Sequence, residues 1–411
     1  MDNRERIDLV GQNLFRFQAA LKQSGTSLQK YLKKNYYEKW MSDHLISALS
    51  IRTTLVNSMH HFLGREGLLN LEKLQLSPVT DPLCHDVEHV PSISYKGQIY
   101  VTTHSMIYAK FLACHNQKIK GIYVDSPNIR LEIEDIDRKQ RGKYLIDFSQ
   151  MDVEVRRNRG INLETYLSET KRVQEILAED FKKAIDFFER LVIYALSEVV
   201  QNNEQDLKAL GIAIEVPKQP FPRFRCDESK KKYGPTYEIK LGKEIKGQCF
   251  WITGILRENY DLVYPYLKEG GKTSLSDVNS ANIYNYDICI KSIIRDSGKQ
   301  TPALEVLSGG MREWLYETIV ERLLDNGIIP ERPVISNGNI SNIEVLGGYG
   351  PFLMIASMKD KRGKHTFPDT FGAGIGVERT LYALCRGPKV NKIDDITCFG
   401  KNPDSHQIYL F

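Results

Sequence analysis

The chain has 411 residues, of which 26% are charged and 41% hydrophobic, and this composition is typical of folded rather than disordered proteins. Its 56 basic and 52 acidic residues leave a net charge of only +4, which argues against a general nucleic-acid coat or a binder of anionic membranes. No apolar run reaches the roughly 18–20 residues of a membrane helix, and the charged N-terminus argues against a secretory signal. The seven cysteines are scattered without a C-x-x-C pair, so we expect reduced thiols and a cytoplasmic location.

The first half of the chain alternates between helical and strand-like patterns. Residues 1–45 show apolar residues at helical spacing, and a second helix over 52–68 is expected to end at Gly67. Apolar side chains recur every three or four residues from 167 to 200, which predicts one long helix with a core-facing stripe. Strands are predicted at 99–103, 121–124 and 144–155.

The second half contains further strands and fewer helices. Residues 217–247 are rich in Pro, Gly and Lys and are predicted to form an irregular insertion. Strands are predicted at 250–252 and 284–294, and a helix from 311 to 325 follows them. A hairpin is predicted over 352–367. The last segment, 373–384, is glycine-rich at its start and helical at its end. Strands outnumber what a parallel βαβ series would supply, so we expect an α+β fold with a mostly antiparallel sheet.

An arginine and a cationic segment form the first candidate site. Arg130 ends a predicted strand, and the charged residues 134–143 separate it from the next strand. Guanidinium groups neutralise phosphate oxygens well, so this arrangement suits a polyphosphate. The alternative is an ordinary solvated hairpin tip.

Two glycine-rich segments form the second and third candidates. Glu305 precedes the pair Gly309-Gly310 and Arg312, where a ligand could approach the backbone; the alternative is a simple strand–turn–helix. Residues 372–379 alternate glycines before a helix that carries Arg379. They do not fit the dinucleotide-binding pattern, because no strand–helix–strand unit follows. They would suit a nucleotide lying flat on the backbone, or a tight turn packed on the sheet.

One metal-like motif is weak. Residues 85–89 read His-Asp-Val-Glu-His, which matches an inverted zinc-protease pattern. Two histidines four apart share a face only on a helix, and Pro82 and Pro91 leave little room for one. We therefore expect a loop rather than a zinc site.

Taken in order, the first three segments resemble the signature motifs of class II aminoacyl-tRNA synthetases. The similarity is strongest to the aspartyl/asparaginyl subgroup and to the related ammonia-dependent asparagine synthetase, and it runs from about residue 46 to the C-terminus. Residues 52–78 resemble motif 1, residues 130–154 motif 2 and residues 374–379 motif 3. The resemblance implies the class II fold, a catalytic domain over 46–411 after a helical extension over 1–45, and a homodimer formed through motif 1.

The resemblance also implies how ATP would be bound. Arg130 would hold the α-phosphate and the substrate carboxylate, Glu132 the adenine amino group, and Arg379 the γ-phosphate. Gly374 and Gly376 would let the nucleotide lie against the backbone.

A metal role follows from the same resemblance. Asp287 and Glu305 would carry Mg²⁺, a cation that prefers oxygen ligands and phosphates. The implied chemistry is attack of a carboxylate on the α-phosphorus of ATP, with Arg130, Glu305 and Arg379 as catalytic residues.

Three residues resemble the amino-acid site of the asparagine synthetase in particular. Residues 77–81 resemble its S-R-V-G-D segment, in which Asp81 would hold the substrate ammonium. His104 and Ser105, with Lys110 six residues after His104, resemble its H-S-x-x-x-x-K pattern.

Three more residues resemble aspartate-binding positions of the subgroup. Gln150 stands where aspartate-binding relatives carry a Q-I-D sequence. Ser308 matches the E-L-S-S-M-G-I-R segment of the asparagine synthetase, and archaeal-type aspartyl enzymes share this serine. Arg312 would bind a substrate carboxylate through its two-pronged guanidinium.

The expected acceptor follows from a missing domain. Aspartyl and asparaginyl-tRNA synthetases carry an N-terminal β-barrel that reads the anticodon, and residues 1–45 read as helix instead. We therefore expect an AMP-forming ligase that passes an aspartate-like carboxylate, free or in a peptide, to ammonia or a small amine. The alternatives are a tRNA synthetase or tRNA-modifying paralogue without the barrel, with residues 1–45 or 217–247 touching RNA, and a catalytically silent binding protein.

Overall fold

An eight-stranded sheet forms the centre of the structure, a computed structural model that describes residues 3–77, 91–103, 106–130, 143–157, 159–257, 261–274 and 277–398. The strand order is β1-β5-β6-β17-β14-β12-β9-β8. Only the two outermost pairs, β1 with β5 and β8 with β9, are parallel, and the five inner pairs are antiparallel. The predicted α+β fold with a mostly antiparallel sheet is therefore confirmed.

The strands of the central sheet are β1 (Leu69–Asn70), β5 (Gly121–Ile129), β6 (Asp147–Arg156), β8 (Arg223–Arg225), β9 (Cys249–Thr253), β12 (Asn285–Ile290), β14 (Leu304–Met311) and β17 (Thr370–Gly376). Smaller sheets contain β2 (Leu76–Ser77), β3 (Ser92–Tyr95), β4 (Gln98–Thr102), β7 (Ile212–Ala213), β10 (Leu267–Lys268), β11 (Gly271–Lys272), β13 (Ile293–Ile294), β15 (Ile335–Ser336) and β16 (Asn339–Ile340).

The α-helices after the N-terminal segment are α4 (Asp43–Arg65), α5 (Ile107–Ala113), α7 (Leu163–Ser168), α8 (Thr170–Asn202), α9 (Glu204–Leu210), α10 (Cys226–Tyr233), α11 (Tyr237–Glu244), α12 (Tyr316–Asp325), α13 (Ile343–Leu346), α14 (Tyr349–Ser357) and α15 (Val377–Cys385). Short 3₁₀ turns lie at η3 (Gly234–Thr236), η5 (Ser280–Asn282) and η6 (Ile393–Ile396).

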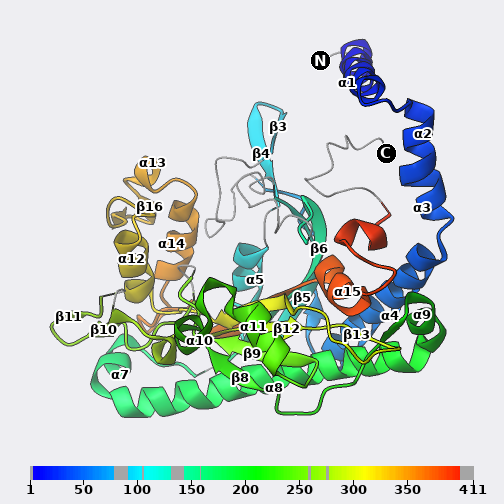
Figure 1. The fold of residues 1–411 in the computed structure, drawn as a ribbon. Coiled ribbons are helices and arrows are strands. Elements are labelled where there is room, and N and C mark those ends of the chain that lie inside the picture. Colours follow the sequence, from blue (N-terminus) through cyan, green and yellow to red (C-terminus); the bar gives the residue numbers. More distant parts are fainter. Residues whose placement is uncertain are drawn as a thin grey trace.

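One face of the central sheet packs on the long helix α8, which runs beneath the sheet in Figure 1. The stripe predicted over 167–200 is buried, and the ring centroids of Phe188 and Phe371 lie 6.2 Å apart. Along β17, Phe371, Ala373 and Ile375 are buried in the same core cluster as this stripe. Because side chains alternate across a strand, the glycines between them lie on the opposite face.

The helix boundaries follow local capping. Helix α4 begins nine residues before the predicted helix, because Ser42 accepts a hydrogen bond from the backbone N–H of His44 at its N-terminus. Gly67, with φ +82°, follows its end as expected. The boundary predicted between residues 45 and 46 falls within the first turn of this helix.

The segment 217–247 is not irregular as predicted. Residues 217–222, which contain Pro217, Pro220 and Pro222, are irregular, and β8, α10 and α11 follow them. Helix α10 has Asp227 and Glu228 in its first turn and Lys230–Lys232 in its last turn, which suits the helix dipole at both ends.

Two further predictions in the second half are wrong. Residues 352–357 belong to helix α14 rather than to a hairpin, because an unbroken apolar run is compatible with either structure. An isolated bridge between Lys359 and His365 is all that remains of the hairpin. Arg312 follows strand β14 and does not open a helix, since α12 begins at Tyr316.

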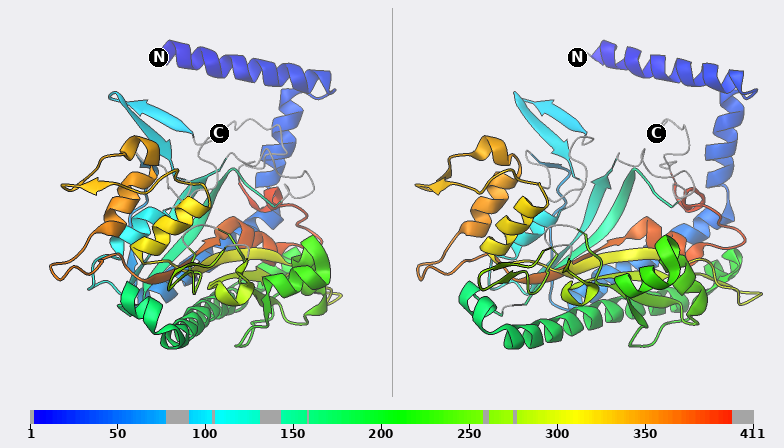
Figure 2. Two further views of the ribbon diagram at one scale, coloured as in Figure 1. Left: turned by 90° about the vertical axis from the view of Figure 1, so that its left-hand side faces the viewer. Right: turned by 60° about the vertical axis from the view of Figure 1, so that its left-hand side comes forward.

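The predicted helical N-terminus is confirmed and projects from the rest of the molecule. Its elements are α1 (Asn3–Gln23), α2 (Leu28–Leu32), the π-helical turn η1 (Lys33–Tyr37) and α3 (Glu38–Trp40). Figure 2 shows α1 on the side of the sheet that lies opposite α8. Among the described residues, no helix is both long and apolar enough to cross a membrane.

Candidate active site

The face of the central sheet turned away from α8 carries polar side chains and glycines. We call it the polar face; its members are Gln150, Asp152, Glu154, Asn285, Asp287, Ser308, Gly310, Gly372, Gly374 and Gly376. The strand register places Asp152 opposite Gly374, Gly374 opposite Ser308, and Ser308 opposite Asp287. Residues separated by more than 130 positions in the sequence thus lie in one row across four strands.

The glycines of β17 leave room for neighbouring side chains. A Cβ atom on Gly374 would overlap the side-chain amide of Gln150, and a Cβ on Gly372 would overlap the carboxylate of Glu154. Gly376 differs, because a Cβ there would meet only the Cβ of Arg379 at an ordinary 3.5 Å. Gly374 is therefore the position at which β17 needs glycine for Gln150 to lie over it.

An arginine binds the buried carboxylate of Asp287. Arg257 donates from Nη1 to Asp287 Oδ1 at 2.6 Å and from Nη2 to the carbonyl of Gly309 at 2.9 Å. Its Nε also lies 3.3 Å from Asp261 Oδ2. Burial raises the pKa of Asp287 to about 7, Arg257 opposes this shift, and the negative charge of Glu305 adds to it.

A second arginine–carboxylate pair lies beside the first. Arg379, in the first turn of α15, donates to Glu305 Oε1 at 3.3 Å and lies over the ring of Tyr144 at 5.0 Å. Arg130, just after β5, lies over the ring of Phe148 at 5.4 Å. The aromatic faces and Glu305 fix two cations at one end of the polar face.

The residue next to Arg379 connects three elements. Glu378 accepts from Nη2 of Arg52 in α4 at 3.3 Å and from the backbone N–H of Ser149 in β6 at 2.9 Å. This fixes the start of α15 against α4 and β6, and with it the position of Arg379.

Two buried cations lie along the polar face, away from the end that carries Arg130 and Arg379. Lys110 Nζ donates to Asp152 Oδ1 at 2.7 Å, and both side chains are nearly inaccessible. Arg312 lies 3.3 Å from Glu154 Oε1 and 3.2 Å from Asp261 Oδ1. Charges buried this deeply are tolerated because they are paired.

A carboxylate from the 217–247 segment faces the same site. Glu238 is half-buried in α11, and burial and the charge of Glu305 raise its pKa, whereas Lys143 and Arg379 lower it. Among the described residues, no three His, Cys, Asp or Glu side chains form a group that could hold a metal ion unaided.

The chain resembles known proteins in part of its sequence and in its fold. No family model matches the chain. It is 31% identical over 179 residues to the aspartate–tRNA(Asp) ligase of Pyrococcus furiosus and 30% identical over 241 residues to that of Thermococcus kodakarensis. These matches cover 41% and 56% of this chain, and the chain spans 39% and 48% of the two relatives. The solved structure of asparaginyl-tRNA synthetase from Pyrococcus horikoshii, bound to asparaginyl-adenylate, superposes with a TM-score of 0.63 at 15% identity, covering 94% of this chain and 74% of that one.

The chain contains a class II aminoacyl-tRNA synthetase-like catalytic core.

The class II-like fold confirms the resemblance read from the motifs. The finer prediction, an asparagine-synthetase-like transfer to ammonia with tRNA as the less favoured acceptor, is not supported, because the relatives found are tRNA ligases. Ammonia as the acceptor therefore gains no support from these relatives.

The class II-like core brings most of the predicted site residues together. Arg130, Gln150, Asp287, Glu305, Ser308, Arg312, Gly374, Gly376 and Arg379 lie on or beside the polar face. Asp81, His104, Ser105 and Glu132, like the His-x-x-Glu-His segment 85–89, lie outside the described residues. Arg312 differs from expectation, since its guanidinium lies between protein carboxylates.

Three residues of the site were missed by reading the sequence. Arg257 and Asp261 carry no motif, although their spacing of four residues is that of a local ion pair. Glu238 fell in the segment predicted to be irregular. Lys110 was noted only for its position after His104, and its pairing with Asp152 could not be read from spacing.

Proposed function

We propose that this core is an ATP-dependent ligase of the aspartyl/asparaginyl type that activates an aspartate-like carboxylate as an acyl-adenylate. An oxygen of the carboxylate attacks the α-phosphorus of ATP, the bond to the bridging oxygen breaks, and pyrophosphate leaves with that electron pair. Arg130 and Arg379 would neutralise the phosphates, and Gly374 and Gly376 would admit the nucleotide.

The observation that carries this proposal is the clustering of two fixed arginines, Arg130 and Arg379, at one end of a polar sheet face with glycines across its middle. In-line transfer at phosphorus needs positioning and charge neutralisation more than covalent chemistry from the protein. Both arginines rest on aromatic rings, so little ordering entropy remains to be lost when a triphosphate binds.

The amino-acid substrate we propose is aspartate. The relatives that match this chain at 31% and 30% identity are named as ligases of aspartate, which supports this choice. Lys110 and Arg312 are each paired with buried protein carboxylates, so they would shape the pocket, and Gln150 and Ser308 would contact the amino acid. The predicted roles of Asp81, His104, Ser105 and Glu132 belong to the same proposal.

Mg²⁺ fits the carboxylates at the arginine end. Burial is the main cause of the raised pKa of Asp287, and the charge of Glu305 adds to it; each carboxylate has an arginine partner, and a divalent cation shared by the two would relieve their remaining repulsion. Mg²⁺ usually takes one or two carboxylates together with phosphate oxygens, so an incomplete protein site is what the proposal requires. Bound there by Glu305 and Asp287, it would neutralise charge on the phosphates.

The acceptor we propose is tRNA, because the relatives are named as ligases of tRNA. The test is ATP–pyrophosphate exchange with aspartate or asparagine, followed by transfer of the labelled amino acid. Acid-precipitable label that ribonuclease releases would support the proposal. Free asparagine formed from aspartate and ammonium would identify ammonia as the acceptor instead, and absence of exchange with either amino acid would contradict the ligase itself.

A homodimer is part of the proposal. Helix α4 and the segment after it expose Ile46, Leu69, Leu74 and Leu76. Exposed apolar side chains in this region are what an interface through motif 1 would cover. Sedimentation equilibrium that gives a mass near 47 kDa at micromolar concentration would contradict it.

The two glycines proposed to admit ATP should differ in their response to substitution. Gly374→Ala is expected to lower kcat/KM for aspartate in the exchange reaction about tenfold or more, because the new methyl group displaces Gln150. Gly376→Ala is the comparison, because its Cβ has room within the protein: any loss there should appear in KM for ATP, and kcat/KM for aspartate at saturating ATP should stay within about threefold. Equal losses in both variants would contradict this role of Gly374.

Glu378 should act as a positioning residue. Glu378→Ala is expected to lower kcat about tenfold, because Arg379 loses the contacts that Glu378 makes with Arg52 and Ser149. Glu378→Gln keeps the hydrogen bond from Ser149 and should recover part of the rate. An unchanged kcat in Glu378→Ala, measured at saturating ATP and aspartate, would show that these contacts do not position Arg379.

A further inference from the structure

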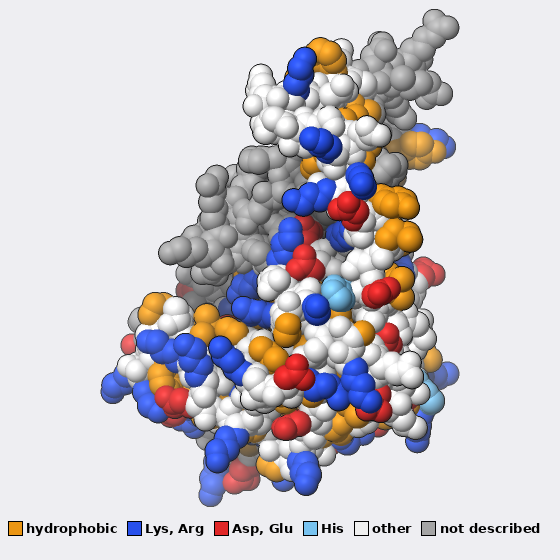
Figure 3. All heavy atoms as spheres, turned by 45° about the vertical axis from the view of Figure 1, so that its right-hand side comes forward, with side chains coloured by type: hydrophobic (Ala, Val, Ile, Leu, Met, Phe, Trp, Pro, Cys, Tyr) orange, Lys and Arg blue, Asp and Glu red, His pale blue; other side chains and the backbone are white. Residues whose placement is uncertain are grey.

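The projecting N-terminal segment is unusual in charge. Between Asp8 and Glu38 the sequence contains no acidic residue, whereas Arg16, Lys22, Lys30, Lys33 and Lys34 are basic. This stretch alone exceeds the net charge of +4 of the whole chain. Figure 3 shows lysine and arginine side chains along this part of the surface.

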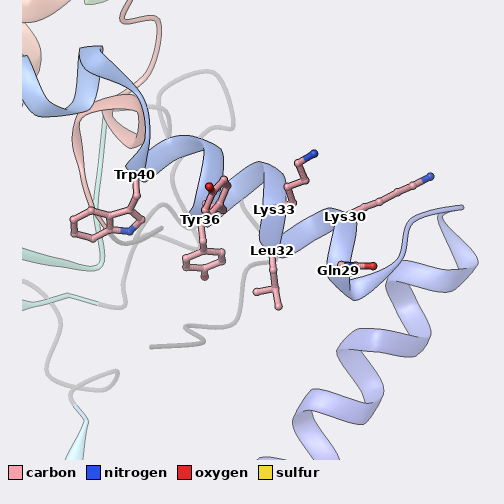
Figure 4. Close-up of a pocket in the computed structure, with 7 residues that line it drawn as sticks. Gln29, Lys30, Leu32, Lys33, Tyr36 and Trp40 are labelled. Atoms are coloured by element: carbon pink, nitrogen blue, oxygen red, sulfur yellow. The ribbon is translucent and has the colours of Figure 1, made fainter.

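The basic side chains share one side of the helical segment. Lys30 lies in the short helix α2, Lys33, Lys34 and Tyr37 lie in the π-helical turn η1 that follows it, and all four side chains are exposed. We call this set the lysine face. In Figure 4, Lys30 and Lys33 point away from the side taken by Leu32 and Trp40. Lys33 pairs with Glu38 at 4.0 Å, and an exposed pair of this kind is weak.

The segment is held in place rather than left loose. Phe17 of α1 is buried and meets the ring of Tyr31 edge-on at 4.9 Å, which fixes α1 against α2. Lys39 is turned inward, where burial lowers its pKa and Asp394 of η6 opposes the shift. An open groove of about 820 Å³ lies along the same helices, lined by Gln29, Lys30, Leu32, Lys33, Tyr36, Tyr37 and Trp40.

The location of the segment relates it to the active site. Figures 1 and 2 place α1–α3 on the side of the sheet opposite α8, the side to which the polar face turns. Helix α1 has 21 residues and is therefore about 30 Å long, enough to follow several phosphates of a nucleic acid.

We infer that the lysine face binds RNA and holds the acceptor of the proposed ligase. This inference rests on the proposed function, because it supplies a partner for the same site. Lysines at helical spacing neutralise successive phosphates without reading sequence, and the exposed ring of Tyr37 offers a surface on which an unpaired base can stack.

The test compares two triple charge reversals in the full chain. One is Lys30→Glu, Lys33→Glu and Lys34→Glu; the control is Lys171→Glu, Lys182→Glu and Lys183→Glu, three exposed residues of α8 on the opposite side of the sheet with the same change in net charge. Binding of unfractionated tRNA is measured between about 50 and 300 mM KCl. The first variant should bind tRNA at least tenfold more weakly than the wild type. The slope of its log binding constant against log salt concentration should be smaller by about two to three, because fewer ions are released on binding. The control should bind tRNA within about twofold of the wild type.

Two further measurements separate the possible failures. ATP–pyrophosphate exchange should be the same in both variants as in the wild type. If the wild type itself shows no exchange, that result would contradict the proposed function and not the RNA surface. Tyr37→Ala should weaken tRNA binding about threefold or more. Equal tRNA binding by the wild type and the first variant, or loss of binding to phosphatidylserine vesicles with tRNA binding intact, would overturn the inference.

Discussion

Arg130→Ala is expected to reduce aspartate-dependent ATP–pyrophosphate exchange about 10²–10³-fold while the fold stays intact. The guanidinium is proposed to neutralise the α-phosphate as the bond to pyrophosphate breaks, and loss of one such preorganised donor has about this effect. The fold should tolerate the change, because Arg130 follows β5 and keeps its backbone hydrogen bond to the carbonyl of Ile146.

The conservative variant distinguishes charge from geometry. Arg130→Lys should recover only part of the rate, because an ammonium cannot present two parallel donors to phosphate. Thermal unfolding monitored by circular dichroism should give midpoints within a few degrees of wild type for both variants. Exchange at the wild-type rate in Arg130→Ala would remove this residue from the proposed mechanism.

Lys110→Met is expected to destabilise the protein by about 3–5 kcal/mol, because it leaves Asp152 buried without its cation. The methionine keeps the volume of the lysine stem, so the change is mainly in charge. Unfolding in urea, followed by tryptophan fluorescence, measures the difference.

A double-mutant cycle identifies the cause. Asp152→Asn in the Lys110→Met background should restore most of the lost stability, since the uncompensated charge is removed with its partner. A double variant as unstable as Lys110→Met alone would show that packing, and not charge, dominates at this position.

The fold was readable where its determinants are local. The apolar stripe of α8 and the strand over 144–155, which is β6, follow from residues a few positions apart, and the structure has these elements, whereas the strand β17 was not predicted from its alternating glycines. Helix α14 was not readable, because an unbroken run such as Phe352–Ala356 fits a strand as well as a helix until its neighbours are known. The prediction for residues 217–247 was wrong, because the prolines at 217, 220 and 222 outweighed the helix-favouring charge pattern of α10 that follows them.

The sequence could predict the site residues that belong to motifs. It could not predict those whose position depends on pairing between distant strands of the sheet. Motifs 2 and 3 indicated Arg130 and Arg379, and the glycine-rich segment between them indicated Glu305. Arg257 reaches Asp287 across 30 positions of sequence, and no periodicity signals such a contact. Arg312 was expected to face a substrate, but the register of β6 places Glu154 beside it first.

The alternation along β17 has a consequence for how this protein can change. Phe371, Ala373 and Ile375 support the core, and the glycines between them serve the polar face, so stability and the proposed substrate preference depend on interleaved residues of one strand. Under the proposed function, substitutions at Gln150 or Ser308 would alter the preferred amino acid without disturbing the packing on α8. Insertion or deletion of one residue between 370 and 376 would exchange the two sets, so new specificities are reachable by point substitution but not by length variation here.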